Sequence, residues 1–481
     1  MSLTKVTYSM INGASVNALD FGADPTGTTD STTAILAAIA AALSAGSQST
    51  EVYFPAGTYL YSSMIDVSNS RQLSFRGQTI SFGGGIKTKL VYTGTVSPAI
   101  KMYDVYSFEL DSLGIVYNNV AFTGNLIESD WDASNLDTQF AYFHDCYFGS
   151  LTAANSAANL IAWNRVVLAK IERCQFSYAV NAINFGFNGN YCNTCLIAYN
   201  TFSAISGRAI VASASLDNIE INGNNFQQSS TGLANAYTQV FGTIVTSLKI
   251  TNNSLQDIST NGATAFAGII SQGCEITGNY FWIPDVSRTD NIIFDIAGGE
   301  GYHFAGNFFR GNTFLKFSQP NIKNVNIIAN YIDVSTVIVN LDNAAIAFQG
   351  TSGNYLVGTV SETGLATGSS VNTGIGLYQS GKLESQINDD ANAYFSKASG
   401  YSSGNYVNFY VNNAVVGNIN TTGSSTRFST TATVFFGSGA GSPEGAVTAP
   451  VGSVYTRTDG GAGTTLYVKE TGTGNTGWAA K

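Results

Sequence analysis

The stretch that decides the fold is LKITNNSLQ, residues 248–256. Its pattern is apolar-x-apolar-x-x-Asn-x-apolar, with Asn253 at the sixth place. The same pattern recurs along the chain in ten copies, 23 to 29 residues apart. The sixth place is held by Asn118, Asn200, Asn224, Asn253, Asn279, Asn307, Asn330 and Asn354, and by Cys146 and Cys174 in two further copies.

A repeat of this length is the mark of a solenoid protein. Apolar and polar residues alternate within each copy, which is the spacing of a strand and not of a helix. Stacked coils of this kind bury a continuous column of like side chains, with about 4.8 Å between neighbouring coils. Asn suits the bend between strands because it tolerates the left-handed conformation and its amide can bond along the stack. We therefore predict an all-β chain, a right-handed parallel β-helix, rather than an antiparallel sandwich.

Composition limits the classes of function. The chain of 481 residues has a formal net charge of −10, so a nucleic acid is not an expected partner. No apolar run reaches the length of a membrane span, and residues 1–13 lack the apolar core of a signal peptide. We expect assembly in a cytoplasm without membrane insertion.

The cysteines predict neither disulfides nor a metal site. There are five of them, and they fall on repeat positions that we expect to be buried. Cys192 and Cys195 form a single CxxC without a second pair, and the chain has only two histidines, His144 and His303. We predict no metal and no cofactor.

The segment before the repeats predicts a cap for the solenoid. An Ala-rich helix is expected from about Thr32 to Leu43, capped by Asp30 or Ser31, followed by a strand at 52–54. Such a helix would cover the open first coil, which otherwise exposes core side chains and unpaired strand edges.

Two quoted stretches carry a resemblance to a known family. DFGADPTGTTDSTTAI at 20–35 and VYFPAGTYL at 52–60 closely resemble the entry segment of the pectate-lyase-like β-helix superfamily, and most of all its phage tailspike branch. The resemblance implies a homotrimer in a virion tail, assembled in the host cytoplasm, that binds a bacterial surface polysaccharide. Tailspikes usually carry a virion-binding domain ahead of this segment, and here almost nothing precedes it. We expect either an adaptor protein as the partner of the N-terminus or an N-terminus that has been cut away.

The pattern predicts five regions along the chain. They are a linker or attachment segment at 1–16, the capping helix and entry at 17–72, the β-helix at 73–365, a C-terminal β domain at 366–440, and a terminal β-hairpin module at 441–481. In the hairpin module, strands at 454–457 and 465–468 flank Asp459-Gly460-Gly461. We expect the two last regions to trimerise the chain or bind a host surface, as the resemblance implies. A simple terminal β cap is the alternative interpretation.

A first group of candidate catalytic residues lies on a predicted strand at 125–130. Glu128 and Asp130 are two residues apart, so a strand places both side chains on one face, about 7 Å apart along the strand. Glycoside hydrolysis uses two carboxyl groups, at roughly 5–5.5 Å for retention or 6.5–9.5 Å for inversion. Candidate sugar-binding residues come from the following loop and from the aligned strand of the next coil: Trp131, Asp132, Trp163 and Arg165. A solvated acidic turn is the alternative interpretation.

A second group lies six coils further on, about 29 Å away by coil spacing. Its candidate catalytic residues are Asp290, Asp295 and Glu300, and its candidate sugar-binding residues are Trp282, Arg288 and Lys316. At that distance the two groups cannot act on the same bond within one chain. An Asp295–Lys316 salt bridge between coils is the alternative interpretation.

The sequence favours a polysaccharide depolymerase that acts by hydrolysis with paired carboxylates. A lyase is the alternative chemistry, with Arg288 as the base near Asp285 and Asp290. A non-catalytic receptor-binding spike and a free polysaccharide-degrading enzyme are the alternative functions.

Overall fold

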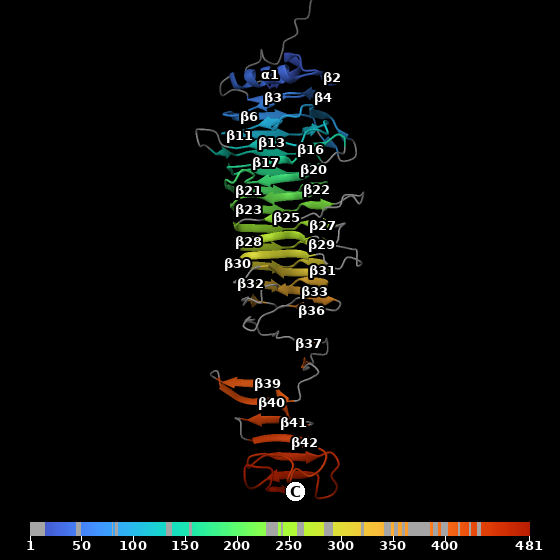
Figure 1. Cartoon of the computed structure of the whole chain (residues 1–481), viewed down its shortest axis with the longest axis vertical. Helices are drawn as coiled ribbons and strands as arrows, with labels where there is room; N and C mark the ends of the chain where they lie inside the picture. Colours follow the sequence, from blue (N-terminus) through green and yellow to red (C-terminus); the bar gives the residue numbers. More distant parts are fainter. Residues whose placement is uncertain are drawn as a thin grey trace, which may run out of the picture. The chain divides into compact units, whose positions relative to one another are not determined.

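A computed structural model of the chain describes residues 15–44, 50–78, 80–81, 85–130, 137–152, 156–227, 239–241, 244–256, 264–282, 292–318, 322–340, 348–350, 355–357, 361–363, 385–387, 393–395, 403–411, 414–422, 425–430 and 434–481. The chain divides into two compact units, Met1–Gly376 and Leu377–Lys481. The first unit is a parallel β-solenoid, which confirms the predicted fold class (Figure 1). The five finer boundaries remain predictions.

Each coil of the first unit contributes to three parallel sheets, here named A, B and C. Sheet A contains β1 (Val16–Asn17), β3 (Glu51–Tyr53), β6 (Arg71–Arg76), β11 (Tyr106–Asp111), β14 (Thr138–Gln139), β15 (Tyr142–His144), β18 (Val166–Val167), β19 (Lys170–Glu172), β21 (Cys192–Ala198), β23 (Leu216–Asn222), β26 (Ile244–Thr251), β32 (Lys323–Ile328) and β34 (Phe348–Gly350). The C-terminal parts of β28 (Thr264–Thr277) and β30 (Ile292–Ala305) also belong to it.

Sheet B follows sheet A in each coil. It contains β2 (Thr26–Asp30), β4 (Gly57–Tyr61), β9 (Thr88–Tyr92), β12 (Gly114–Tyr117), β16 (Tyr147–Ser150), β24 (Asn225–Gln227), β27 (Ser254–Gln256), β29 (Tyr280–Trp282) and β35 (Tyr355–Val357). The N-terminal parts of four longer strands complete it: β20 (Gln175–Phe185), β22 (Thr201–Ala212), β31 (Phe308–Phe317) and β33 (Tyr331–Asn340).

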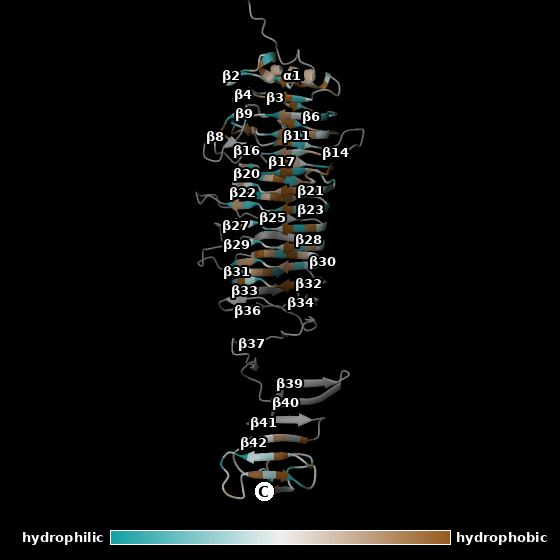
Figure 2. Ribbon diagram, turned by 180° about the vertical axis from the view of Figure 1, so that it is seen from behind, coloured by the Kyte–Doolittle hydropathy of each residue, from teal (hydrophilic) through white to brown (hydrophobic). Residues whose placement is uncertain are grey.

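Sheet C closes each coil before the chain returns to sheet A. It contains β5 (Ile65–Asp66), β10 (Ile100–Lys101), β13 (Asn125–Ser129), β17 (Asn159–Trp163), β25 (Gln239–Phe241) and β36 (Ser361–Thr363), with the remaining parts of β20, β22, β28, β30, β31 and β33. Hydrophobic residues run along the strands throughout the stack (Figure 2).

The Asn ladder lies at the bend between sheets A and B. Asn253 Oδ1 accepts hydrogen bonds from the backbone N and the Nδ2 of Asn224, at 2.9 and 3.0 Å. Asn253 Nδ2 donates to the carbonyl of Ile221 at 2.8 Å and to Asn279 Oδ1 at 3.1 Å. The same bonds link buried asparagines on consecutive coils: Asn200, Asn224, Asn253, Asn279, Asn307 and Asn330. At the bend, the Asn side chains therefore form hydrogen bonds with backbone N–H and C=O groups that have no partner in a neighbouring strand.

The first copy of the repeat was wrongly assigned. Leu113, and not Asn118, precedes the strand that pairs with Tyr147, so Leu113 stands one coil before Cys146. Asn118 follows the end of β12 and is not buried in the ladder. The reason is that Leu113 carries no amide to mark the bend, while Ile115, Asn118 and Val120 match the spacing by chance. Asn354 of the last copy lies outside the described residues.

The column two residues after the bend is apolar and buried, as the repeat predicts, and four consecutive members are phenylalanines. Phe148, Phe176, Phe202 and Phe226 stack with ring centroids 5.0 to 5.1 Å apart and planes within 16° of each other. The five cysteines are all buried and unpaired, which confirms their interpretation as small core residues. Burial raises the pKa of the Cys192 thiol to about 11, so that thiol stays protonated at neutral pH.

Helix α1 (Thr32–Ser44) covers the first coil and confirms the predicted cap. The backbone N of Thr32 donates to Asp30 Oδ1 at 2.7 Å, which gives the helix its N-terminal cap. The helix buries Ile35, Ala38 and Ile39 toward β1, β3 and β6. A short 3₁₀ helix, η2 (Ala18–Phe21), precedes it, and a β7 (Ile80–Ser81)–β8 (Gly85–Ile86) hairpin follows β6.

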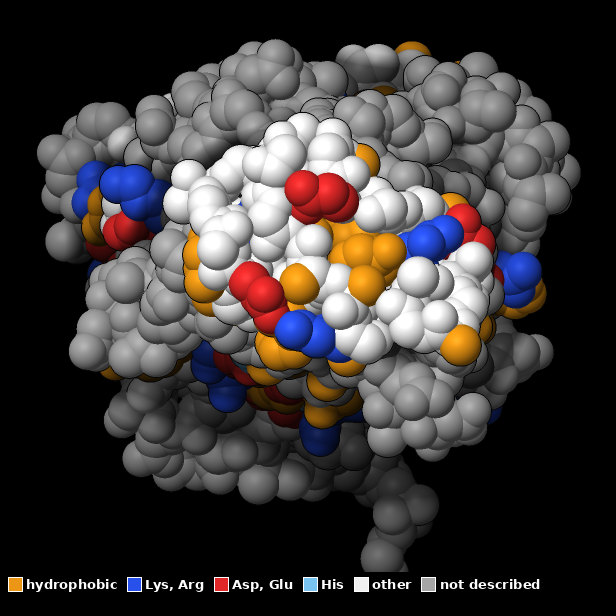
Figure 3. All heavy atoms as spheres, turned by 90° about the horizontal axis from the view of Figure 1, so that it is seen from below, with side chains coloured by type: hydrophobic (Ala, Val, Ile, Leu, Met, Phe, Trp, Pro, Cys, Tyr) orange, Lys and Arg blue, Asp and Glu red, His pale blue; other side chains and the backbone are white. Residues whose placement is uncertain are grey.

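The second unit contains antiparallel strands. A seven-stranded sheet joins β39 (Ser403–Val411), β40 (Ala414–Thr422), β41 (Ser425–Thr430), β42 (Val434–Gly439), β43 (Val454–Arg457), β44 (Leu466–Lys469) and β45 (Trp478–Ala480), and a separate pair joins β37 (Ser385–Ile387) and β38 (Ala393–Phe395). The predicted hairpin around Asp459 is confirmed, since Tyr455 pairs with Tyr467. In the view onto the C-terminal end, acidic and basic side chains border a small hydrophobic area (Figure 3). Within the described residues, every helix is too short or too polar to cross a membrane.

Candidate functional site

The outer face of sheet C carries a row of polar side chains from successive coils. Asp66 pairs in register with Lys101, and Lys101 pairs in register with Glu128. Glu128 is followed on the next two coils by Ala162 and Asn184. The predicted alignment of 125–129 with 159–163 is therefore confirmed, and Glu128 stands in a row where polymer could lie along the stack.

Two neighbouring side chains hold the Glu128 carboxylate. The Tyr103 hydroxyl donates to Oε1, and Asn125 Nδ2 donates to Oε2 at 2.8 Å. Burial raises the pKa of Tyr103 well above its ordinary value, and the hydrogen bond to Glu128 raises it further. Lys101 Nζ lies 4.5 Å from the centroid of the Tyr103 ring and 3.4 Å from Asp66 Oδ2. Glu128 is thus fixed in orientation and remains half-buried.

Asp130 is an anchoring residue and not a second open carboxylate. It is only 7% exposed. The Asn164 amide donates to its Oδ1, and Asn188 Nδ2 donates to its Oδ2 at 2.9 Å. Both oxygens are therefore engaged with the protein, which holds the turns after β13, β17 and β20 together.

The prediction that Trp163 stacks on a sugar is wrong. Trp163 pairs in register with Ser129, which lies between Glu128 and Asp130 and points to the opposite side of the strand. Its ring is fully buried and packs 5.6 Å from Phe143 and 5.8 Å from Phe185, centroid to centroid. The alternation of side chains along a strand explains the error, because the acids and the tryptophan occupy positions of opposite parity.

Arg165 of the first group lies in the turn that leads from β17 back to sheet A. Arg165 Nε forms an ion pair with Asp137 Oδ1 at 2.6 Å, and the Tyr191 hydroxyl donates to Asp137 Oδ2 at 2.9 Å. The Arg165 side chain is therefore already paired with an acidic side chain of the protein, Asp137. Trp131 and Asp132 lie outside the described residues.

The described members of the second group lie on three different sheets. Asp295 is on sheet C, where Lys316 Nζ contacts its Oδ2 at 3.3 Å and the Ser318 hydroxyl donates to its Oδ1. Glu300 is exposed on sheet A, opposite Lys323. Trp282 is on sheet B, opposite Arg310, and is 36% exposed. The predicted cross-coil salt bridge is confirmed, but no shared sugar site forms from these residues. Arg288 and Asp290 lie outside the described residues, as does Asp285.

Sequence reasoning missed a charged network on the outer face of sheet A. His144 Nε2 lies 3.0 Å from Glu109 Oε1, and His144 Nδ1 lies 2.9 Å from Asp145 Oδ2 and 3.5 Å from Asp111 Oδ1. Arg173 NH2 contacts the same Asp145 oxygen at 2.8 Å. The correct register would have revealed it, since Asp111 pairs with His144 once the bend is placed at Leu113.

The network sets the charge of its histidine. Burial acts to lower the pKa of His144, but the hydrogen bonds to Asp145 and Glu109 and the charge of Asp111 outweigh it, so the pKa is raised. The Arg173 hydrogen bond outweighs burial in the other direction and lowers the pKa of Asp145. Both shifts favour the charged forms of the pair.

The same atoms have the spacing of a metal site. Ligand atoms of Asp111, His144 and Asp145 lie within 4.8 Å of one another. Each already has a protein partner. Glu109 and Asp145 engage the two imidazole nitrogens, Arg173 engages Asp145, and the Ser112 hydroxyl donates to Asp111 Oδ1 at 2.7 Å. Ion pairing within the protein accounts for this geometry.

Comparison with known families identifies the architecture. A family model described as rhamnogalacturonase A/epimerase, pectate lyase-like, matches residues 15–313 of the chain. The chain belongs to this pectate-lyase-like family. The match covers the solenoid through most of its coils, including the sheet C row and the His144 network.

Solved structures give similar β-helices at low identity. The catalytic unit of a GH87 α-1,3-glucanase from Streptomyces thermodiastaticus strain HF3-3 is 14% identical, with 75% of this chain and 69% of that chain covered and a TM-score of 0.41. The A-module of the Azotobacter vinelandii mannuronan C-5 epimerase AlgE6 is 14% identical, with 73% and 98% covered and a TM-score of 0.42. PfbA, a surface adhesin of Streptococcus pneumoniae, is 15% identical, with 73% and 93% covered and a TM-score of 0.43. No curated protein matches the chain. At these identities the likenesses say nothing about the activity of this chain.

For a pectate-lyase-like chain, the sheet C row is the described site best suited to a polymer. It combines an oriented carboxylate at Glu128, a second carboxylate at Asp66, a cation at Lys101 and an amide at Asn184 on four coils. Asp66 and Glu128 are two coils apart, so their strands are separated by about 9.6 Å. Inverting glycosidases place their carboxyl groups roughly 6.5–9.5 Å apart, and this strand separation lies just above that range.

Proposed function

We propose that the chain is a bacteriophage tailspike that binds a bacterial surface polysaccharide, a capsule or O-antigen, and depolymerises it by hydrolysis on sheet C. Family membership supports a carbohydrate-active β-helix. The tailspike assignment rests on the resemblance of the entry segment at 20–35 and 52–60 to that branch. Assembly in the host cytoplasm and attachment to the virion through an adaptor are parts of the same proposal.

The observation that carries the hydrolase proposal is the pair Asp66 and Glu128 on one sheet face. In an inverting reaction one carboxyl group protonates the departing oxygen, and the other activates a water molecule on the opposite side of the ring. Lys101 stands between them in the register, and its Nζ contacts Asp66 Oδ2 at 3.4 Å, so it holds the Asp66 carboxylate in place. Tyr103 and Asn125 keep Glu128 in place, which limits the cost of orienting it for the reaction. Asp66 thus replaces Asp130 as the partner of Glu128.

Reducing-end release from purified capsular polysaccharides of a strain panel tests this function. The variants Glu128→Gln and Asp66→Asn should each lower the rate on the polysaccharide that the wild type cuts by a factor on the order of 10²–10⁴. Asp217→Asn, exposed on sheet A, is the matched control and should keep the wild-type rate. Wild-type rates in both sheet C variants would refute the site. An unsaturated product that absorbs ultraviolet light would identify a lyase instead.

A non-catalytic receptor spike is the second candidate function. It is favoured by the engagement of Asp130 and Asp295 with protein partners, which leaves fewer open carboxylates than the sequence suggested. The same strain panel separates the two functions, because a receptor spike binds its polysaccharide without releasing reducing ends.

A homotrimer is part of the proposal. Sheet B presents a row of outward rings in which Tyr280, Phe308 and Tyr331 stack at centroid distances of 4.7 Å, with Tyr280 40% exposed. Parallel packing of three chains would cover such a row.

A further inference from the structure

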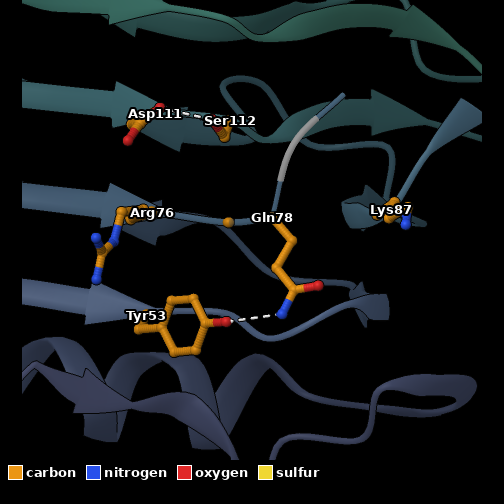
Figure 4. A pocket seen from close by; sticks show the side chains of 7 residues that line it. Tyr53, Arg76, Gln78, Lys87, Asp111 and Ser112 are labelled. Carbon is orange, nitrogen blue, oxygen red and sulfur yellow. Dashed lines mark hydrogen bonds between the residues drawn. The ribbon is translucent and has the colours of Figure 1, made fainter. Parts of the chain in front are cut away.

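A polar pocket lies away from sheet C, where strands of sheet A end and β9 of sheet B begins. It has a volume of about 420 Å³, within the usual range for small-ligand sites. Gly77 forms part of its wall, and a Cβ there would lie 2.5 Å from the Ser112 carbonyl, so only glycine fits. The side chains that line it are Tyr53, Arg76, Gln78, Lys87, Asp111 and Ser112 (Figure 4).

Most of the lining is held in place by interactions within the protein. Gln78 Nε2 donates to the Tyr53 hydroxyl at 2.9 Å. The Arg76 guanidinium lies 5.5 Å from the centroid of the Tyr53 ring and contacts Glu51 at 2.8 Å. These contacts fix a ring, an amide and a cation before any ligand arrives, which lowers the cost of binding.

Lys87 is the exception. It is exposed, and it forms no ion pair with another residue of the described ranges. Figure 4 shows it across the pocket from Arg76, with Gln78 between them. The chain has 31 acidic and 21 basic residues, so the Lys87 side chain places a positive charge on a protein that is acidic overall. Its ammonium group is suited to an anionic group on a ligand.

We propose that this pocket is a second saccharide site, separate from sheet C, that binds a sugar ring carrying a carboxylate. Lys87 binds the carboxylate, Gln78 and Asp111 bind ring hydroxyls, and the Tyr53 ring contacts the apolar edge of the sugar. Asp111 disfavours a phosphate or another compact dianion, but a carboxylate accepts hydroxyl donors well. The inference rests on the proposed polysaccharide function and adds a substrate class to it, a surface polysaccharide with acidic sugars.

The site would hold polymer near the spike between cleavage events. Because the pocket uses sheets A and B, a chain bound there leaves the sheet C row open for another segment. Two such sites on one spike raise the effective concentration of polymer at the catalytic face. Variants of the pocket should therefore weaken binding of long polymer without changing the rate on short, saturating oligosaccharides.

Ligand-observed nuclear magnetic resonance on the full chain tests the inference. The probes are a glucuronate-containing trisaccharide, a pyruvate ketal of galactose and a neutral trisaccharide, so that the two sources of a sugar carboxylate are compared directly. We expect one of the acidic probes to bind, and Lys87→Met to weaken it about tenfold, the effect of losing one charge-assisted contact of about 1.4 kcal/mol. Lys89→Met is the matched control on β9, outside the pocket, and should bind as the wild type does.

The outcomes separate the inference from the proposed function. If neither acidic probe binds, or if Lys87→Met binds as tightly as the wild type, the inference is overturned. Loss of binding in Lys89→Met to the same degree would also overturn it, because general charge would then explain the effect. If a probe binds through Lys87 while no polysaccharide of the panel is cut, the pocket stands and the hydrolase proposal fails.

Discussion

Removing one rung of the Asn ladder should destabilise the solenoid strongly. Asn253→Ala leaves two buried backbone groups without a partner, the N–H of Asn224 and the carbonyl of Ile221. A buried group that loses its hydrogen bond costs about 1–3 kcal/mol, so the variant should lose about 2–6 kcal/mol of unfolding free energy. Asn222→Ala is the control, because Asn222 is half-buried and its side chain bonds only to other side chains: Nδ2 donates to Glu220 at 3.2 Å, and Oδ1 accepts from Asn252 Nδ2 at 3.2 Å.

Guanidinium chloride unfolding followed by far-ultraviolet circular dichroism measures the difference. Hydrogen exchange of peptides from 216–256 locates it, since protection should fall in the coils that Asn253 joins and stay unchanged near α1. If Asn253→Ala and Asn222→Ala lie within 1 kcal/mol of each other, the ladder does not stabilise the bend as argued.

Three further predictions follow from other parts of the molecule. The pKa of His144 is raised in the folded protein, so the protonated imidazole stabilises the fold fully below its ordinary pKa of about 6.5, and this stabilisation is lost as pH rises through the folded value. His144→Gln should therefore flatten the dependence of the melting temperature on pH across this window. An unchanged dependence would count against the network. Trp163→Ala should cost about 3–5 kcal/mol in denaturant unfolding while the folded variant keeps wild-type affinity for the polysaccharide; a loss of affinity without a loss of stability would restore the stacking role. Light scattering of the full chain should give three times the mass of one chain, and a monomer would refute the trimer.

The sequence was most informative where the repeat has a chemical marker. Asn200 to Asn330 could be placed at the bend because a buried amide that bonds to both neighbours leaves few alternatives at that position. Leu113 has no such marker, and the neighbouring Asn118 was taken in its place. That error shifted the first coils and concealed the approach of Asp111 to His144.

Only part of the site could be predicted. Alternation along a strand shows on which face of the sheet a side chain lies, but not which residues it contacts. The outward position of Glu128 followed from its spacing, yet the pairing of Trp163 with Ser129 showed that the neighbouring aromatic points inward. Asp130 shares the parity of Glu128, but amides from two later turns bind it, and such contacts between distant segments leave no pattern in the sequence. Asp66 was missed because two coils separate it from Glu128 and its strand has only two residues.

The most direct test of hydrolysis on sheet C is product analysis of the cleaved polysaccharide in heavy-oxygen water. The account predicts that wild-type protein places heavy oxygen at each new reducing end, as mass spectrometry of the released oligosaccharides would show, and that Glu128→Gln releases almost none of these products. Unsaturated ends without heavy oxygen, or labelled products from Glu128→Gln at the wild-type rate, would contradict it.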